Sequence, residues 1–109
     1  TNFSTWLMRH SIKHIHTAIE KLEWTHMRHI KVYGEGNEAR LTGTHETSSY
    51  YKFTHGESDR GCSIRIPNSV VKDGKGYFED RRPAANCDPY LVASAMIRTV
   101  CLENSLASV

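Results

Sequence analysis

The stretch from Gly76 to Pro83 gathers residue types that bind charged ligands. Side chains alternate between two faces of a β-strand, so a strand here places Tyr77, Glu79 and Arg81 on one face. A phenol, a carboxylate and a guanidinium on one surface can hold a nucleotide, a divalent metal and an anionic substrate together. The run therefore predicts a binding site on one face of a strand.

A second strand is expected over residues 62–66, where apolar and polar side chains alternate. Residues 68–76 include Asp-Gly and predict a hairpin connection to a strand over residues 77–82. In an antiparallel pair, Arg65 lies on the same side as Glu79, and arginines near a carboxylate suit the recognition of phosphates and carboxylates. A solvent-facing ladder of salt bridges, each worth little, is an equally weighted alternative.

Apolar residues in the first third recur at spacings of three and four, which is typical of one face of an α-helix. The pattern predicts one helix that begins at Ser4 or Thr5 and ends near His29. Residues 30–33 are expected to be extended, and residues 34–37 to form a glycine-containing turn. The predicted apolar stripe of the helix consists of Met8, Ile12, Ile15, Ile19 and Leu22.

A last helix is expected from Asp88, because this N-cap residue precedes a proline at the first helical position. The order helix, loop, strand, strand, helix predicts an α+β fold. Two or three strands are too few to close a core alone, so further sheet is expected upstream. The predicted buried stripe of this helix consists of Leu91, Val92, Ala95, Met96 and Val100.

Residues 40–59 show no periodicity and are mainly polar. A loop of this length inside a compact domain is usually functional or disordered. Arg40, His45 and Glu46 favour a functional loop, because loops position reactive groups. A plain surface pair of His45 and Glu46 is the simpler interpretation of those two residues.

The remaining combinations predict no metal site and no nucleophile. His10 and His14 have the spacing of a helical metal pair, but no third ligand stands at a matching position. Neither Cys62 nor Cys87 has an adjacent histidine base. Trp6 and Trp24 are expected to pack between helices. The other histidines of the first helix are expected on its surface: His14, His16, His26 and His29.

Composition sets outer limits on the function. The chain has 109 residues, 39% hydrophobic and 24% charged, which is ordinary globular composition and argues against disorder. A net charge of +2 argues against a nucleic-acid binder, and no apolar run has membrane-spanning length, so neither nucleic acid nor membrane is an expected partner. Three cysteines without a CxxC pair favour reduced thiols and a cytoplasmic location, although an organellar signal further upstream is compatible with the chain.

Several ordered motifs resemble glutamine synthetase of the eukaryotic class II type. The likeness extends from Thr1 to about residue 103, and the whole chain, residues 1–109, is interpreted as a C-terminal piece of the catalytic domain. The absence of an initiator Met agrees with a piece of a longer protein. The motifs lie in residues 1–5, 37–43, 45–47, 59–67 and 76–89.

The resemblance implies ATP-dependent joining of ammonium to glutamate through a γ-glutamyl phosphate. It also implies an α/β barrel of antiparallel strands with flanking helices, sites between subunits of a ringed homo-oligomer, and Mg²⁺ or Mn²⁺ as metal. Glu79 is the one implied metal ligand within this chain. The implied ATP contacts are Asn2, Phe3, Ser4, Arg60, Arg65, Tyr77, Phe78 and Glu79.

The same resemblance implies the residues that handle glutamate and carry out catalysis. Arg40, Arg60 and Arg81 would bind glutamate, and Arg40 would also steady the transferred phosphoryl group. Glu46 would close over the intermediate and take part in ammonium binding and deprotonation. Phosphoryl transfer depends mainly on cations around the moving group, and a closed loop protects an acyl phosphate from water.

Departures from the family pattern leave two alternatives open. Glu57 and Ser58 replace apolar residues, which makes the packing near Arg60 uncertain, and Trp6 stands where lysine is common. A non-catalytic member of the family and a γ-glutamyl ligase for a larger amine are the alternatives to glutamine synthesis. The isolated 109 residues are expected to be inactive.

Overall fold

Alternation along two short strands builds the sheet. In β3 (Ile64–Ile66) both isoleucines are buried and Arg65 between them is half-buried. β4 (Phe78–Asp80) repeats the pattern, with Phe78 and Asp80 buried and Glu79 half-buried. The two strands pair antiparallel, which confirms the predicted pairing.

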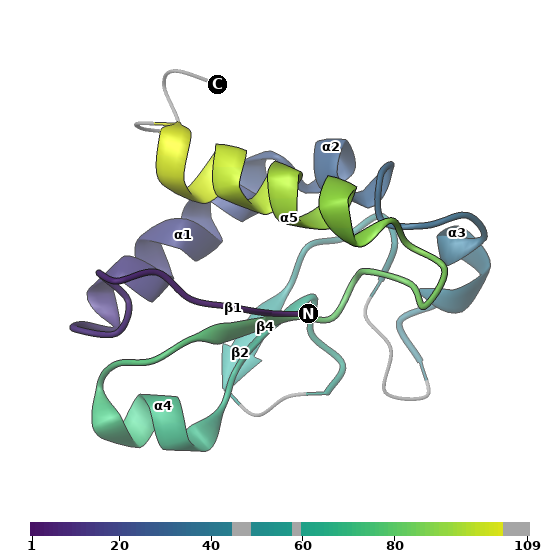
Figure 1. Cartoon of the computed structure of the whole chain (residues 1–109). Coiled ribbons are helices and arrows are strands. Elements are labelled where there is room, and N and C mark those ends of the chain that lie inside the picture. The colour runs from purple at the N-terminus through teal and green to yellow at the C-terminus, as the bar shows by residue number, and fades with distance from the viewer. Residues whose placement is uncertain (45–48, 58–59, 104–109) are drawn as a thin grey trace.

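The computed structural model describes residues 1–44, 49–57 and 60–103, and its sheet contains four strands in the order β1-β4-β3-β2 (Figure 1). The two outer strands are β1 (Asn2–Phe3), antiparallel to β4, and β2 (His55–Glu57), parallel to β3. The helices are α1 (Lys13–Trp24), α2 (His26–Ile30), α3 (Asn37–Arg40), α4 (Asn68–Asp73) and α5 (Pro89–Ile97), followed by a π-helical turn, Arg98–Leu102.

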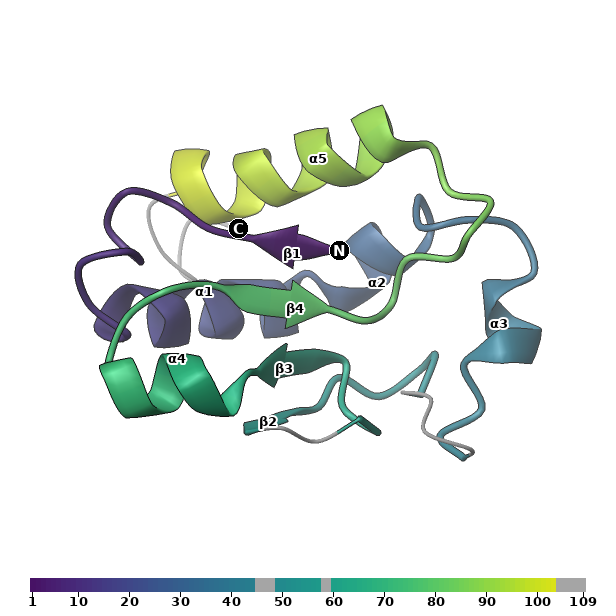
Figure 2. The ribbon, with the colours of Figure 1, turned by 60° about the horizontal axis from the view of Figure 1, so that its bottom comes forward.

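One face of the sheet packs against helices, and no described helix or strand covers the other, open face (Figures 1 and 2). The inward side chains of β3 and β4 join those of α1 and Met96 of α5 in one hydrophobic cluster. The α+β class is thus confirmed. The sheet is open at both edges, so closure into a barrel stays a prediction.

The predicted first helix begins later than expected. Its stripe is buried at Met8, Ile15, Ile19 and Leu22, but only the last three belong to α1. Residues 4–12 are non-helical and form turns at residues 6–10 and 12, because their polar groups bond to the segment before β4. Three such bonds are Ser4 Oγ to Gly76 O at 2.9 Å, Gly76 N to Met8 O at 2.9 Å and Ile12 N to Gly74 O at 2.7 Å.

A break at Thr25 divides the predicted helix a second time. The hydroxyl of Thr25 donates to the carbonyl oxygens of Lys21 and Leu22, in competition with the helical bonds. Helix α2 begins after this break, so its side chains no longer follow the periodicity predicted for the first helix. His26 and His29 are buried, which contradicts their predicted place on the helix surface. Residues 31–33 form a turn after α2, so the expected extended segment is also wrong.

The two tryptophans do not pack between helices. Trp6 and Trp24 are 65% and 66% exposed, which contradicts the prediction for both. Trp6 lies against the ring of His10, with centroids 4.0 Å apart. Its indole therefore covers a surface turn rather than the core.

The loop regions contain more structure than the sequence indicated. The segment between β3 and β4 includes the helix α4, and part of the expected 40–59 loop forms β2. The parallel pairing of β2 also departs from the purely antiparallel expectation. Glu57 is exposed at this edge strand, so the charged residue needs no buried partner there.

Helix α5 begins where the sequence predicted. The Asp88 carboxylate accepts a hydrogen bond from Tyr90 N at 2.9 Å, and Pro89 opens the helix. Val92 and Met96 are buried as expected, but Leu91 is 51% exposed, so its predicted burial is wrong. Across the described ranges of the chain, no helix is long and apolar enough to span a membrane.

Candidate functional site

The open face of the sheet carries a row of polar side chains. Asn2 of β1 is directly opposite Glu79 of β4, which is directly opposite Arg65 of β3. Opposite residues in neighbouring strands place their side chains on the same face. Glu79 and Arg65 thus share this face as predicted, whereas Tyr77 and Arg81 flank β4 and their place on the face stays a prediction.

Arg65 and Glu79 form an ion pair on this face. The Arg65 Nε to Glu79 Oε2 distance is 2.5 Å, and the side chains are 25% and 18% exposed. The hydrogen bond to Glu79 raises the pKa of Arg65. The salt bridge of the second alternative is thus present, and the binding of phosphates or carboxylates by this face stays a prediction.

A shallow cavity of about 360 Å³ adjoins this row. The predicted nucleotide residues Asn2, Phe3, Ser4 and Tyr77 line it, together with Arg9 and Gly76. Pairing of β1 with β4 explains why residues from opposite ends of the chain meet here. Arg9 was not predicted, because the turn that brings it beside Ser4 has no signal in a helical pattern.

A second group of cations lies at the end of β4. Burial lowers the pKa of Arg40, and the nearby positive charge of Arg81 lowers the pKa further. The Arg40 guanidinium donates to Asn37 Oδ1 at 2.9 Å and to the main-chain oxygen of Arg82 at 2.6 Å. Both acceptors are uncharged, so they hold the guanidinium without neutralising it.

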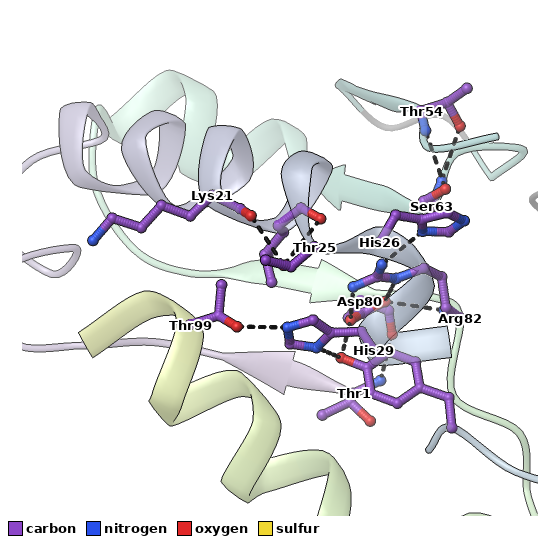
Figure 3. A network of polar contacts seen from close by, with 12 residues as sticks. Thr1, Lys21, Thr25, His26, His29, Thr54, Ser63, Asp80, Arg82 and Thr99 are labelled. Atoms are coloured by element: carbon purple, nitrogen blue, oxygen red, sulfur yellow. Dashed lines mark hydrogen bonds and ion pairs between the residues drawn. The ribbon is translucent and has the colours of Figure 1, made fainter. Parts of the chain in front are cut away.

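The alternate residues of the same strand belong to a buried network on the inner face (Figure 3). Asp80 and Arg82 form a bidentate ion pair, with N–O distances of 2.9 and 2.8 Å, and both side chains are 0% exposed. Tyr33 donates its hydroxyl hydrogen to Asp80 at 2.9 Å. Burial opposes ionisation of Asp80, but Arg82 outweighs it and holds the pKa of Asp80 below its usual value.

Two histidines complete this network in defined neutral forms. Arginine has no acceptor, so Arg82 Nη1 donates to His26 Nδ1, and His26 Nε2–H donates to Tyr50 O at 2.7 Å. The Tyr33 hydroxyl is already a donor to Asp80, so it accepts from His29 Nδ1–H at 2.8 Å. Thr99 then donates to His29 Nε2 at 2.7 Å.

Burial is the main cause of the altered histidine pKa values. It lowers the pKa of His26, and the charge of Arg82 acts in the same direction. It lowers the pKa of His29 to about 4. Neutral imidazoles with every ring nitrogen bonded act as structural links here, and this role was not predicted because both histidines were assigned to a helix surface.

The other predicted residues divide into three groups. The Phe78 side chain is 0% exposed within the core, so a nucleotide contact from Phe78 requires its main chain. Arg60 is exposed in the turn before β3, and its role stays a prediction. Glu46 and His45 lie outside the described residues, as does Ser58.

A divalent metal would find one suitable carboxylate here. Glu79 Oε2 is bonded to Arg65, and the other oxygen of Glu79 is the remaining candidate donor on the open face. Among the residues that the structure describes, no three His, Cys, Asp or Glu side chains cluster as a metal site. Glu79 fits a metal site only as one ligand among several, and the others must come from elsewhere.

The fold and this face together define a class, an α+β segment with polar and cationic side chains beside a shallow cavity. No protein-family model matches the chain. Curated relatives do match it closely. The chain is 60% identical over 103 residues to glutamine synthetase of Yarrowia lipolytica, covering 93% of this chain and 28% of that protein.

Two further relatives give the same result. Glutamine synthetase of Kluyveromyces lactis is 59% identical over 109 residues, which covers 96% of this chain and 29% of that protein. Glutamine synthetase 2 cytoplasmic of Drosophila melanogaster is 55% identical over 109 residues, which covers 94% of this chain and 30% of that protein. The chain belongs to the glutamine synthetase family and spans 28–30% of the length of these relatives.

Proposed function

We propose that the protein carrying this chain is a glutamate–ammonia ligase, which uses ATP to form glutamine through γ-glutamyl phosphate. The cross-strand row of Asn2, Glu79 and Arg65 beside the cavity supports this proposal most directly. It places groups suited to a nucleotide, a metal and phosphate oxygens on one surface. The close relation to glutamine synthetases supports the choice of reaction.

In this proposal the chain contributes two adjoining parts of the site. Asn2, Phe3, Ser4 and Tyr77 contact the nucleotide, and Arg65 binds its phosphates. Glu79 supplies one ligand to Mg²⁺ or Mn²⁺, which would neutralise phosphate charge when bound. The Arg65–Glu79 ion pair orders both side chains until these ligands replace the contact.

The second part handles glutamate and the transferred group. Arg40 and Arg81 lie close enough for the charge of one to lower the pKa of the other. Like charges repel, so the two guanidinia destabilise each other in the free protein. An anion that binds between them offsets this repulsion. Arg60 and Glu46 complete the proposed site, with Glu46 in ammonium binding and deprotonation.

The assembly, the barrel and the location are also proposals. The open edges of the sheet agree with continuation into the barrel of a C-terminal catalytic domain. A ringed homo-oligomer is proposed with sites between its subunits. A cytoplasmic location is supported by the name of the Drosophila relative.

An activity assay of the protein that carries this chain tests the proposal. ADP release should require both glutamate and ammonium, and replacing ammonium with a polyamine or ethanolamine should abolish it. In Arg81→Ala the KM for glutamate should rise about 10- to 100-fold, since a charge-assisted bidentate contact is lost. The control Arg98→Ala changes an exposed arginine remote from this face and should leave that KM unchanged.

Two outcomes contradict the proposal in different ways. Release of ADP with a larger amine but not with ammonium would identify a different γ-glutamyl ligase. Absence of any glutamate-dependent ADP release from the folded, assembled protein would favour a non-catalytic member of the family.

A further inference from the structure

The Asn37 side chain lies between two parts of the proposed glutamate site. It is 2% exposed and belongs to the first residue of α3. Its Nδ2 donates to the main-chain oxygen of Arg82 at 2.6 Å, and its Oδ1 accepts from Arg40 Nε at 2.9 Å. Arg40 Nη2 donates to the same Arg82 oxygen at 2.6 Å, so the three residues form a closed cycle of hydrogen bonds.

The Arg82 oxygen is a fixed point in the molecule. The Arg82 side chain is fully buried and doubly bonded to Asp80, which leaves its backbone little freedom. Residues 33–40 are docked against this segment by Ala84 N to Tyr33 O at 2.8 Å and by Asn86 Nδ2 to Glu35 O at 3.1 Å. A cycle built on this oxygen therefore transmits the rigidity of the buried network to the surface.

Gly34 allows this docking to be close. Its φ is +120°, and a Cβ there would lie 2.5 Å from Asn86 Oδ1 and 2.8 Å from Ala84 Cβ. Only glycine combines that backbone conformation with that separation. The approach of the loop brings Asn37 within bonding distance of Arg82, so the position of Asn37 is a consequence of the local packing.

We propose that Asn37 is a positioning residue for the Arg40 guanidinium. The inference rests on the proposed function, in which Arg40 binds the glutamate carboxylate and the transferred phosphoryl group. Among the described residues, Arg40 Nη1 has no hydrogen-bond partner, while Nε and Nη2 are held by Asn37 and Arg82. Two nitrogens therefore fix the plane of the guanidinium, and the third is left for an anion.

An asparagine amide is suited to this role because it combines a donor and an acceptor. The donor is needed for the Arg82 oxygen and the acceptor for Arg40 Nε. An aspartate would face the carbonyl without a donor and would also neutralise Arg40. The neutral amide orders a flexible cationic side chain before the ligand arrives, which reduces the entropy lost on binding.

Steady-state kinetics of the protein that carries this chain test the inference with Asn37→Ala and a matched control, Asn86→Ala. Both asparagines donate to a backbone oxygen in the same docked region, but only Asn37 contacts Arg40. In Asn37→Ala the KM for glutamate should rise about 10- to 100-fold, as two hydrogen bonds that orient a charged group are lost. The KM for ATP should stay within about twofold, and Asn86→Ala should resemble the parent.

A double-mutant cycle separates positioning from a general structural role. Arg40→Lys removes the planar fork that Asn37 holds. In that background Asn37→Ala should change the KM for glutamate less than about threefold, because residues that act through one another are not additive. An equal effect in both backgrounds, or a loss of kcat with unchanged KM for glutamate, overturns the inference.

Crystal structures of the two variants provide a readout that does not depend on activity. In Asn37→Ala the Arg40 guanidinium should leave the Arg82 oxygen, and in Asn86→Ala it should stay. An Arg40 side chain unmoved in Asn37→Ala overturns the inference even in an inactive protein. Absence of glutamate-dependent activity in the parent rejects the proposed function separately, while the structures still judge the positioning.

Discussion

Charged residues at alternating positions, in β4 and directly after it, have different environments. Glu79 and Arg81 are half-buried, whereas Asp80 and Arg82 are fully buried. The outer pair Arg65–Glu79 has side chains 25% and 18% exposed, and the inner pair Asp80–Arg82 has both at 0%. Because side chains alternate between the two faces of a strand, neighbouring residues of similar chemistry have different environments.

The difference shows which interactions a charged side chain needs in each environment. A buried ion pair must recover a large desolvation cost, so it needs good geometry and additional hydrogen bonds. Asp80 and Arg82 have these from Tyr33 and His26. The outer charges keep contact with water and can exchange one partner for another, which a ligand-binding group requires.

The largest expected effect comes from the same substitution on the two faces. Arg82→Met leaves the Asp80 carboxylate buried without its partner and should lower the free energy of unfolding by about 3–5 kcal/mol. Arg65→Met leaves Glu79 near water and should lower it by about 1 kcal/mol or less. Urea denaturation of the protein that carries this chain, followed by circular dichroism, measures both values.

In the folded variants, Arg65→Met should reduce activity more than Arg82→Met does. Arg65→Met should lose at least about tenfold in kcat/KM for ATP, because a phosphate contact is removed from the transition state. Equal losses of stability in the two variants would abolish the distinction between the faces.

A smaller effect is expected from acid. The pKa of His29 is about 4 in the folded protein and 6.5 ordinarily, so the unfolded chain binds more protons between these values. The stability due to neutral His29 is therefore complete above about pH 6.5 and is lost as the pH falls towards 4, by about 3 kcal/mol. Denaturation midpoints measured at intervals across this range test the direction, which the lowered pKa of His26 reinforces.

His29→Gln is the control for this pH dependence. Glutamine supplies a donor and an acceptor but does not titrate, so the dependence between pH 6.5 and 4 should become shallower. Asp80 contributes in the same direction only at lower pH, because its pKa is already depressed. An unchanged slope in His29→Gln would assign the acid sensitivity to other groups.

The smallest expected effect lies at the edge of the buried network. Thr99→Val removes the hydroxyl that donates to His29 Nε2 and accepts from Arg28 Nη2. It should cost about 1–3 kcal/mol in the free energy of unfolding, since a buried acceptor loses its donor. Thr17→Val removes an exposed hydroxyl on α1 and should change stability by no more than about 0.5 kcal/mol. Similar losses in both variants would show that the network ends before Thr99.

The open face was predictable because short-range rules determine it. Alternation predicted that Glu79 shares a face with Arg65, and the N-cap at Asp88 predicted the start of α5. The role of Asn37 was not predictable, because Arg82, the partner that completes its hydrogen-bond cycle with Arg40, is 45 positions away and meets it only after the loop docks. The same holds for Arg9, which reaches the cavity through a turn held by Gly74 and Gly76.

The buried network was missed for a related reason. Helical periodicity assigned His26 and His29 to a continuous helix, and that phase ends where the Thr25 hydroxyl competes for backbone carbonyls. Threonine is tolerated in many helices, so the residue type alone does not signal a break. Tyr33 is only four residues from His29, but the other partners of the two histidines, Tyr50, Arg82 and Thr99, are distant in sequence, and no local rule connects them.

The pairing of β1 with β4 has a consequence for how the chain folds. Thr1 and Asp80 are hydrogen-bonded although 79 positions separate them. The β3–α4–β4 unit forms from near neighbours, whereas β1 must close a loop of almost the whole described chain. Strand β1 is thus expected to be among the last elements to join the sheet, so the cavity that it lines is completed late in folding.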